Sequence, residues 1–311
     1  MSYIKWLAVS VVAMCAIPCQ ADNIYVGSGE SIVKYDSAGN RTVFADSDIP
    51  NGLAFDKGGN LYVANGIYAF GYISKYDSSG NVTFPGSKMT GPKGIALDSA
   101  GNLYVANNSG GPAYSSWIEK VDTAGNSSLF ATIPGSVSRA NGLAFDKNDN
   151  LYVASVSTTS AFNGILKIDP SGTISSFLSD NWDWPFGLAI DSAGTLVCTN
   201  DSVIYKVSSS GEKENFTYQF NLPDWYPQGC AFDSHDNLYV SYINFNAGLE
   251  GLIVEFDQSG NQIWSASLGG DGTGGSFIAT QSPEPASMTL LAIGAAAILR
   301  RRSRQVSRRS A

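Results

Sequence analysis

Residues 51–65 read NGLAFDKGGNLYVAN, and close copies of this phrase return at residues 93–107, 141–155, 186–200 and 228–242. A second phrase, IVKYDSAGN, alternates with the first and is found at residues 32–40, 73–81, 118–126, 165–173, 203–211 and 253–261. In both phrases, short apolar or aromatic runs flank a turn rich in Asp, Gly and Asn, which is typical of a β-hairpin. Each repeating unit therefore comprises two hairpins, or four antiparallel strands.

The length of the unit identifies the architecture. The repeat recurs every 42 to 48 residues, as the spacing from Leu61 to Leu103 and then to Leu151 shows. Four short strands at this period are typical of one blade of a β-propeller. The strand that contains Leu61 occurs six times along the chain, which favours six blades over seven. We therefore predict an all-β fold, a six-bladed β-propeller with four-stranded antiparallel blades.

The ring also needs a closing strand. The strand of the Gly-Leu-Ala-Phe type is missing ahead of the first unit, and the run from Gly275 to Ala279 has the character of the missing copy. We predict that this C-terminal strand joins the N-terminal blade, because closure removes the open sheet edges that would otherwise need protection. The propeller then spans residues 22–280.

The two ends of the chain have a different composition from the propeller. Residues 1–21 have the pattern of a signal peptide, with Lys5 ahead of an apolar stretch and small residues at the cleavage site. Residues 281–311 form a tail in which Pro283, Glu284 and Pro285 precede an apolar run at 288–299, predicted as a short hydrophobic helix, and an arginine cluster. Arginines at the end of such a helix stay on the cytoplasmic side of a membrane.

This order of Pro-Glu-Pro motif, hydrophobic helix and arginine cluster resembles the PEP-CTERM sorting tail of Gram-negative bacteria. The resemblance covers about the last 30 residues. It implies export through the inner membrane, transient anchoring by the C-terminal helix, and processing by a sorting protease of the exosortase type. The processed protein would then reside at the cell surface or outside the cell. A plain C-terminal membrane anchor is the alternative interpretation.

The charge of the predicted propeller limits its partners. Between residues 22 and 280 the chain has 12 basic and 26 acidic residues, a net charge of −14. Such a domain repels nucleic acid and anionic membrane surfaces, so neither is a predicted partner. Cys198 and Cys230 are the two cysteines outside the signal peptide. An oxidising compartment permits a disulfide between them, and their apolar surroundings equally permit two buried thiols.

A ligand is expected on one face of the disc. The short Asp-containing turns fall on one face, and the opposite face carries longer, variable loops, where binding sites of repeat scaffolds are usually found. These loops are rich in aromatic residues, which can stack on sugar rings while their polar atoms form hydrogen bonds. We therefore predict a polysaccharide or another envelope component as the ligand. The candidate ligand-binding residues are Tyr114, Trp182, Asp183, Trp184, Trp225 and Tyr226.

The repeats resemble NHL-type repeats and, more loosely, the six-bladed propellers of the gluconolactonase and regucalcin family. That resemblance implies a divalent cation such as Ca²⁺ at the channel mouth, for which Asn51, Asn141 and Asp201 match the family's Asn and Asp ligand positions. The Glu ligand of the family has no match, and an oxygen cage that lacks a carboxylate binds a hard cation more weakly. The residues that open the inner strands are instead Asn51, Lys93, Asn141, Phe186, Gln228 and Gly275.

Two functions follow from these observations. The first is a monomeric, non-catalytic binding module for an extracellular polysaccharide or envelope component. The alternative is a divalent-metal-dependent hydrolase or lactonase of the gluconolactonase type. The residues favour the first over an enzyme, since the single histidine, His235, lies in a hairpin turn and no catalytic residue is assigned.

Overall fold

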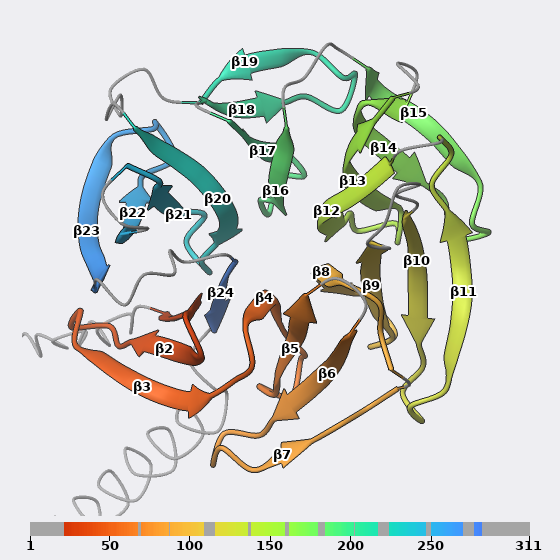
Figure 1. The fold of residues 1–311 in the computed structure, drawn as a ribbon. Coiled ribbons are helices and arrows are strands. Elements are labelled where there is room, and N and C mark those ends of the chain that lie inside the picture. The colour runs from red at the N-terminus through yellow and green to blue at the C-terminus, as the bar shows by residue number, and fades with distance from the viewer. Residues whose placement is uncertain are drawn as a thin grey trace, which may run out of the picture.

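The chain folds into six four-stranded antiparallel sheets arranged around a central axis, as predicted (Figure 1). The computed structural model describes residues 22–67, 70–86, 88–108, 116–135, 138–158, 162–179, 184–201, 203–216, 224–246, 250–269 and 277–281. Blade 1 has the strand order β24-β1-β2-β3, and blades 2 to 6 take the remaining strands in sequence order, four to a blade. The prediction of a six-bladed propeller is confirmed.

The strands keep the same radial order in every blade. The inner strands are β4 (Pro50–Phe55), β8 (Pro92–Leu97), β12 (Ser138–Phe145), β16 (Pro185–Ile190), β20 (Trp225–Phe232) and β24 (Ile278–Gln281). The second strands are β1 (Asn23–Ser28), β5 (Leu61–Ile67), β9 (Leu103–Asn108), β13 (Leu151–Ser157), β17 (Leu196–Asn200) and β21 (Leu238–Asn244). The third strands are β2 (Ser31–Tyr35), β6 (Phe70–Tyr76), β10 (Ser116–Val121), β14 (Gly164–Ile168), β18 (Val203–Val207) and β22 (Glu250–Phe256). The outer strands are β3 (Arg41–Asp46), β7 (Val82–Thr83), β11 (Ser127–Thr132), β15 (Ile174–Ser179), β19 (Lys213–Asn215) and β23 (Gln262–Gly269).

The core lies between neighbouring blades and follows the second and third strands. Leu61 and Val63 of β5 are at most 1% exposed, and Ile32 of β2 is completely buried. The outer strands face solvent, with Val43 of β3 and Leu129 of β11 more than half exposed. A strand buried on both faces has a continuous apolar sequence, which is why the Leu-Tyr-Val phrase is the best-preserved part of the repeat.

The repeated Asp residues organise the hairpin turns. In the first turn Asp36 Oδ1 accepts hydrogen bonds from the backbone N–H groups of Ala38 and Asn40 at 2.9 and 2.8 Å, and Gly39 has a φ of 80°. These bonds lower the pKa of Asp36, the side-chain bond from Asn40 contributing most. The carboxylate is thus fully engaged within its own turn, which accounts for the repeated Asp without a bound cation.

Two turns carry Asp where the others carry Gly at positive φ. Asp149 and Asp236 have φ values of 58° and 59°. Asp149 accepts hydrogen bonds from the N–H and hydroxyl of Ser99 in the preceding blade, at 2.8 and 2.6 Å, and Asp236 does the same with Ser192. The cost of the left-handed conformation is therefore offset by a link between blades on the turn face.

The last strand closes the ring, as predicted. Blue β24 lies beside the red first blade in Figure 1, and it pairs with β1 from Asn23↔Gln281 to Val26↔Ile278. Thr280 Oγ1 donates to Phe232 O of blade 6 at 2.6 Å. The strand includes Gln281, one residue beyond the predicted boundary at 280, because Gln281 still pairs with β1.

Other predictions are corrected or completed by the structure. On the face where longer, variable loops are expected, the segment between Asn65 and Gly71 is largely paired instead, since the β5–β6 ladder continues to Ile67↔Phe70. Cys198 and Cys230 are free, buried thiols, and burial raises the pKa of Cys230 to about 12. The signal peptide, the Pro-Glu-Pro motif and the C-terminal hydrophobic helix lie outside the described residues. Within the described part of the chain, no helix is long and apolar enough to cross a membrane.

Candidate functional site

One register position is repeated at the loop-side end of each inner strand. Pro50 of β4 pairs with Asn65, and the next regular pair is Leu53 with Val63, so β4 holds one extra residue as a β-bulge. Blades 3 to 6 repeat this bulge, and such bulges re-aim side chains next to functional sites. We call the first bulged residue of each strand the axial position. The described axial residues are Asn51, Lys93, Asn141, Phe186 and Gln228.

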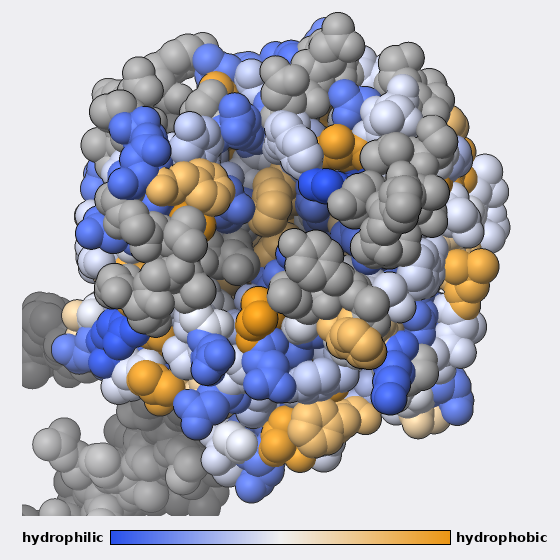
Figure 2. Space-filling view, in the orientation of Figure 1, coloured by the Kyte–Doolittle hydropathy of each residue, from blue (hydrophilic) through white to orange (hydrophobic). Residues whose placement is uncertain are grey.

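A second register position lies two residues earlier, and we call it the rim position. Its described residues are Ile49, Gly91, Arg139, Trp184 and Tyr226. The rim position combines a cation with two aromatic rings on neighbouring blades. Together the axial and rim positions form the candidate site, at the end of the propeller that bears the variable loops. Figure 2 views the molecule along the propeller axis, and its coloured residues show hydrophilic and hydrophobic side chains interspersed around the centre.

Lys93 is the one ionisable side chain among the described axial residues. Its Nζ donates to Asn51 Oδ1 at 2.9 Å, and Asn51 Nδ2 donates to Gly66 O at 2.6 Å. Burial and, secondarily, the Arg139 guanidinium lower the pKa of Lys93. In the described part of the chain no carboxylate lies within 4.0 Å of this ammonium group. Among the described residues, the Lys93 ammonium group therefore donates to an amide oxygen and to no carboxylate.

The three predicted cation ligands do not form an oxygen cage. The Oδ1 of Asn51 already accepts from the Lys93 ammonium, and Asn141 Nδ2 donates to Pro185 O at 2.9 Å. Asp201 is exposed in the turn between β17 and β18. No group of three His, Cys, Asp or Glu side chains with metal-binding spacing is found among the described residues. A hard cation needs several oxygen ligands and would be repelled by Lys93, so these residues do not fit Ca²⁺.

Trp184 is the most prominent aromatic residue of the site. It precedes β16, has a φ of 63°, and is 50% exposed. The Arg139 guanidinium carbon lies 5.0 Å from the centroid of the Trp184 ring, a cation–π contact between blades 4 and 5. The rim residues Ile49 and Gly91 also have positive φ values, of 50° and 55°, so this left-handed conformation recurs at the rim position of three blades. Trp184 therefore leaves half of its surface open to solvent while it contacts Arg139.

The remaining predicted ligand residues are only partly described. Tyr226 packs its ring against that of exposed Phe245, with centroids 5.3 Å apart. Trp225 is half-buried and packs against the core of blade 6. Tyr114, Trp182 and Asp183 lie outside the described residues. The structure therefore brings Trp184 and Tyr226 to the same register position on adjacent blades, whereas Trp225 contributes to packing.

Two aromatic rings also meet across the axial end. The ring of Phe186 stacks on that of Phe277, the residue before β24, with centroids 5.4 Å apart. The pairing of Ile278 with Val26 places Phe277 where blade 2 has Gly52, so blade 1 lacks the glycine of the repeat. The predicted opening residue of this strand, Gly275, lies outside the described residues. This pair of rings adds an apolar contact to the candidate site.

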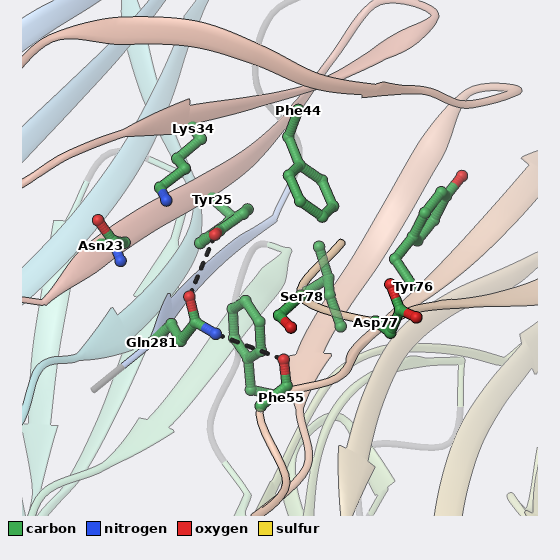
Figure 3. A pocket seen from close by; sticks show the side chains of 11 residues that line it. Asn23, Tyr25, Lys34, Phe44, Phe55, Tyr76, Asp77, Ser78 and Gln281 are labelled. Atoms are coloured by element: carbon green, nitrogen blue, oxygen red, sulfur yellow. Dashed lines mark hydrogen bonds between the residues drawn. The ribbon is translucent and has the colours of Figure 1, made fainter. Parts of the chain in front are cut away.

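A cavity of about 200 Å³ lies on the opposite, turn-bearing face, between blades 1 and 2 (Figure 3). Tyr25 donates to Gln281 Oε1 at 3.1 Å, and Gln281 Nε2 donates to Gly59 O at 3.4 Å. The Tyr25 ring makes edge contacts with Phe44 and Phe55. Tyr104, the equivalent tyrosine of blade 3, makes equivalent edge contacts with Phe130 and Phe145 between blades 3 and 4. The cavity therefore belongs to the repeating packing between blades. His235 also lies on this face, 4.0 Å from Asp233.

Sequence reasoning did not identify Lys93 or Arg139 as site residues. Each places a positive charge at a register position that carries an uncharged residue in the other described blades, and this difference was the signal available in the sequence. The contact between Arg139 and Trp184 joins residues 45 positions apart, a separation close to the repeat period. Aligning the repeats by register, rather than reading each loop alone, would have placed these residues together.

Comparisons with known proteins agree with the resemblance of the tail to PEP-CTERM sorting motifs and with that of the propeller to the gluconolactonase family. Residues 283–304 match the family model described as the PEP-CTERM protein-sorting motif. This motif indicates export and membrane-anchored sorting, so the predicted sorting tail is confirmed. No match is found among curated protein sequences.

Solved structures show the same fold. A gluconolactonase from Xanthomonas campestris is 16% identical with a TM-score of 0.58, over 71% of this chain and 84% of that chain. A protein of unknown function from Bacteroides caccae is 14% identical with a TM-score of 0.63, over 85% and 100% of the two chains. A virginiamycin B lyase from Staphylococcus aureus is 19% identical with a TM-score of 0.52, over 72% and 73%. At these identities the similarity shows the propeller fold and nothing finer.

Proposed function

We propose that this chain is an exported, non-catalytic binding module whose propeller holds an extracellular polysaccharide or another envelope component at the axial and rim positions. The observation that carries the proposal is the half-exposed Trp184 ring, held at positive φ and stacked on Arg139. A preorganised aromatic ring with adjacent polar donors is a common way to bind a sugar, because the ring covers its C–H face while the donors bond its hydroxyls.

The chemistry of the axial residues supports binding over hydrolysis. The described axial positions hold two Asn, one Gln, one Phe and one Lys. General acid–base catalysis needs a group that can exchange a proton within hydrogen-bond reach of the substrate. Among the described axial residues only Lys93 can do this, and its ammonium group already donates to Asn51. The alternative, a metal-dependent lactonase, needs a cation at the site, and Lys93 makes the site unfavourable for one.

The sorting tail determines where the protein is located in the cell. We propose that a sorting protease of the exosortase type cleaves within the tail, so that the mature protein lacks Met288 and all later residues and resides at the cell surface or outside the cell. The expected result is a secreted species whose intact mass matches a chain without the apolar run and the arginine cluster. Recovery of the uncleaved chain from the membrane of a host that has such a protease would contradict this.

Trp184→Ala should weaken glycan binding at least about tenfold, equivalent to about 1.4 kcal/mol, because it removes the stacking surface. Binding can be measured by isothermal titration calorimetry with oligosaccharides from the host's own exopolysaccharide. Phe84→Ala is the matched control, since Phe84 is an aromatic residue 65% exposed near an outer strand. The control should bind like the wild type. Equal affinity of the Trp184 variant and the control would contradict the assignment of the ligand to this ring.

A further inference from the structure

We propose that the ligand of this site is an anionic polysaccharide, whose acidic group binds between Lys93 and Arg139 while a sugar ring stacks on Trp184. This inference rests on the proposed function and specifies the class of glycan. It starts from the contacts of Lys93, which differ from those of Lys75 and Lys120.

Two lysines of the third strands, Lys75 and Lys120, are paired with carboxylates. Lys75 Nζ lies 3.2 Å from Asp56 Oδ2 and 4.7 Å from the centroid of the Tyr62 ring. Lys120 lies 3.9 Å from Asp98 and 5.3 Å from the Tyr104 ring. Lys93 is partly buried and contacts an amide oxygen, which carries no charge to balance the ammonium. A charge that is partly removed from water without a counter-charge is costly, so an anion at this position would be favoured.

The arrangement of the three side chains suits an extended ligand. Lys93 belongs to β8, Arg139 to β12, and Trp184 precedes β16, so the groups come from the successive blades 3, 4 and 5. The neighbouring inner strands contact one another directly, as do the Arg139 and Trp184 side chains. The site therefore offers cation, cation and aromatic ring in order around the axis, next to the amides of Asn51 and Asn141.

The charge of the rest of the domain makes this pair specific. Residues 22–281 carry a net charge of −14, so two adjacent cations are not part of a generally basic surface. Arg139 also contributes, after burial, to the lowered pKa of Lys93, as expected for a second positive group on the neighbouring blade. An acidic group between them would relieve this repulsion, and a neutral sugar would not.

The test uses the exported protein and three probes: alginate oligosaccharides carrying carboxylates, dextran sulfate oligosaccharides carrying sulfate esters, and neutral dextran oligosaccharides. We expect binding of at least one acidic probe, and weaker binding at 200 than at 20 mM salt, because screening reduces charge interactions. The acidic probe that binds more tightly identifies the anionic group. Preference for either acidic probe over dextran supports the proposal.

Two pairs of variants locate the acidic group. Lys93→Gln keeps a donor for Asn51 and removes the charge, so the affinity for the acidic probe should fall at least about tenfold. Lys57→Gln, at an exposed lysine on the turn face, should stay within about twofold. Arg139→Lys should retain most of the binding that Arg139→Gln loses, which separates loss of charge from loss of folding. Melting temperatures of all variants verify that they are folded.

The outcomes distinguish this inference from the proposed function. Equal binding of neutral and acidic probes, lost in Trp184→Ala and unchanged in Lys93→Gln, would overturn the acidic class and leave the glycan-binding function standing. Binding of an acidic probe that is unaffected by Lys93→Gln and Arg139→Gln would overturn the assigned site. If the protein bound none of the three probes and no polysaccharide of the host, both the acidic class of ligand and the proposed glycan-binding function would be overturned.

Discussion

Gly94→Ala should destabilise the propeller by about 3 kcal/mol, at the upper end of overpacking costs, although it adds a single methyl group. A Cβ atom at Gly94 would lie 2.1 Å from Asn141 O and 3.0 Å from Gly142 Cα, both in the next blade. Backbone atoms cannot rotate away as a side chain can, so the two inner strands must move apart. For a domain of this size the melting temperature should fall by roughly 6 to 12 °C, measurable by circular dichroism or calorimetry.

The effect is large because the same contact is repeated around the axis. A Cβ at Gly52 would lie 2.2 Å from Lys93 O, and one at Gly142 or Gly187 would lie 2.5 Å from a carbonyl oxygen of the following blade. The inner strands thus approach one another through glycines, immediately after the axial residues. Displacing one strand therefore also displaces Lys93 and Asn51, and the variant should lose ligand affinity together with stability.

Gly58→Ala is the matched control within the same repeat. Gly58 is exposed, is not at positive φ, and a Cβ there would meet only the side chains of Asn60 and Asp56 at 3.3 Å. The free energy of unfolding should change by no more than about 0.5 kcal/mol. If Gly94→Ala unfolded at the same temperature as this control, the inner strands would be more loosely packed than the structure indicates.

The sequence predicted the parts of the fold that local chemistry determines. The Asp-x-x-Gly-Asn turns form as expected because Asp36 and its counterparts bond to backbone N–H groups within four residues. The closing strand was predicted from the character of five residues, since only an apolar strand completes blade 1. The extension of β5 to Ile67 was missed, because a glycine such as Gly66 is typical of a loop in the sequence. In the structure Gly66 has a positive φ and still belongs to the continuing β5–β6 ladder.

The candidate site was harder to predict because it depends on contacts between blades. The bond from Lys93 to Asn51 and the stack of Arg139 on Trp184 each join residues about one repeat apart. Lys93 and Arg139 occupy positions of the repeat that the sequence treats as ordinary strand ends. Their importance follows from the bulge, which gathers the side chains of successive inner strands at one end of the axis.

A chain that ends at residue 275 should fail to form a stable monomer, whereas a chain that ends at Gln281 should keep the native melting temperature. The two differ by six residues and both lack the sorting tail. The shorter chain loses β24 and Phe277, and with them the burial of Phe277, Ile278 and Ala279, each at most 8% exposed. That apolar burial alone contributes about 5 kcal/mol, comparable to the whole stability of many domains.

The loss also opens the ring. Without β24, the β1 backbone from Asn23 to Val26 has no partner on its inner side, and the hydrogen bond from Thr280 to blade 6 is removed. An unpaired edge beside an exposed core is prone to association, so size-exclusion chromatography should show aggregates in place of a monomer. Ile278→Asp in the longer chain tests the same closure without truncation, and it should lower the melting temperature because it places a charge in the core of blade 1. If the chain ending at 275 remained monomeric and melted with the longer chain, closure by β24 would not contribute to stability, and the ring would be held by the contacts between the other five blades.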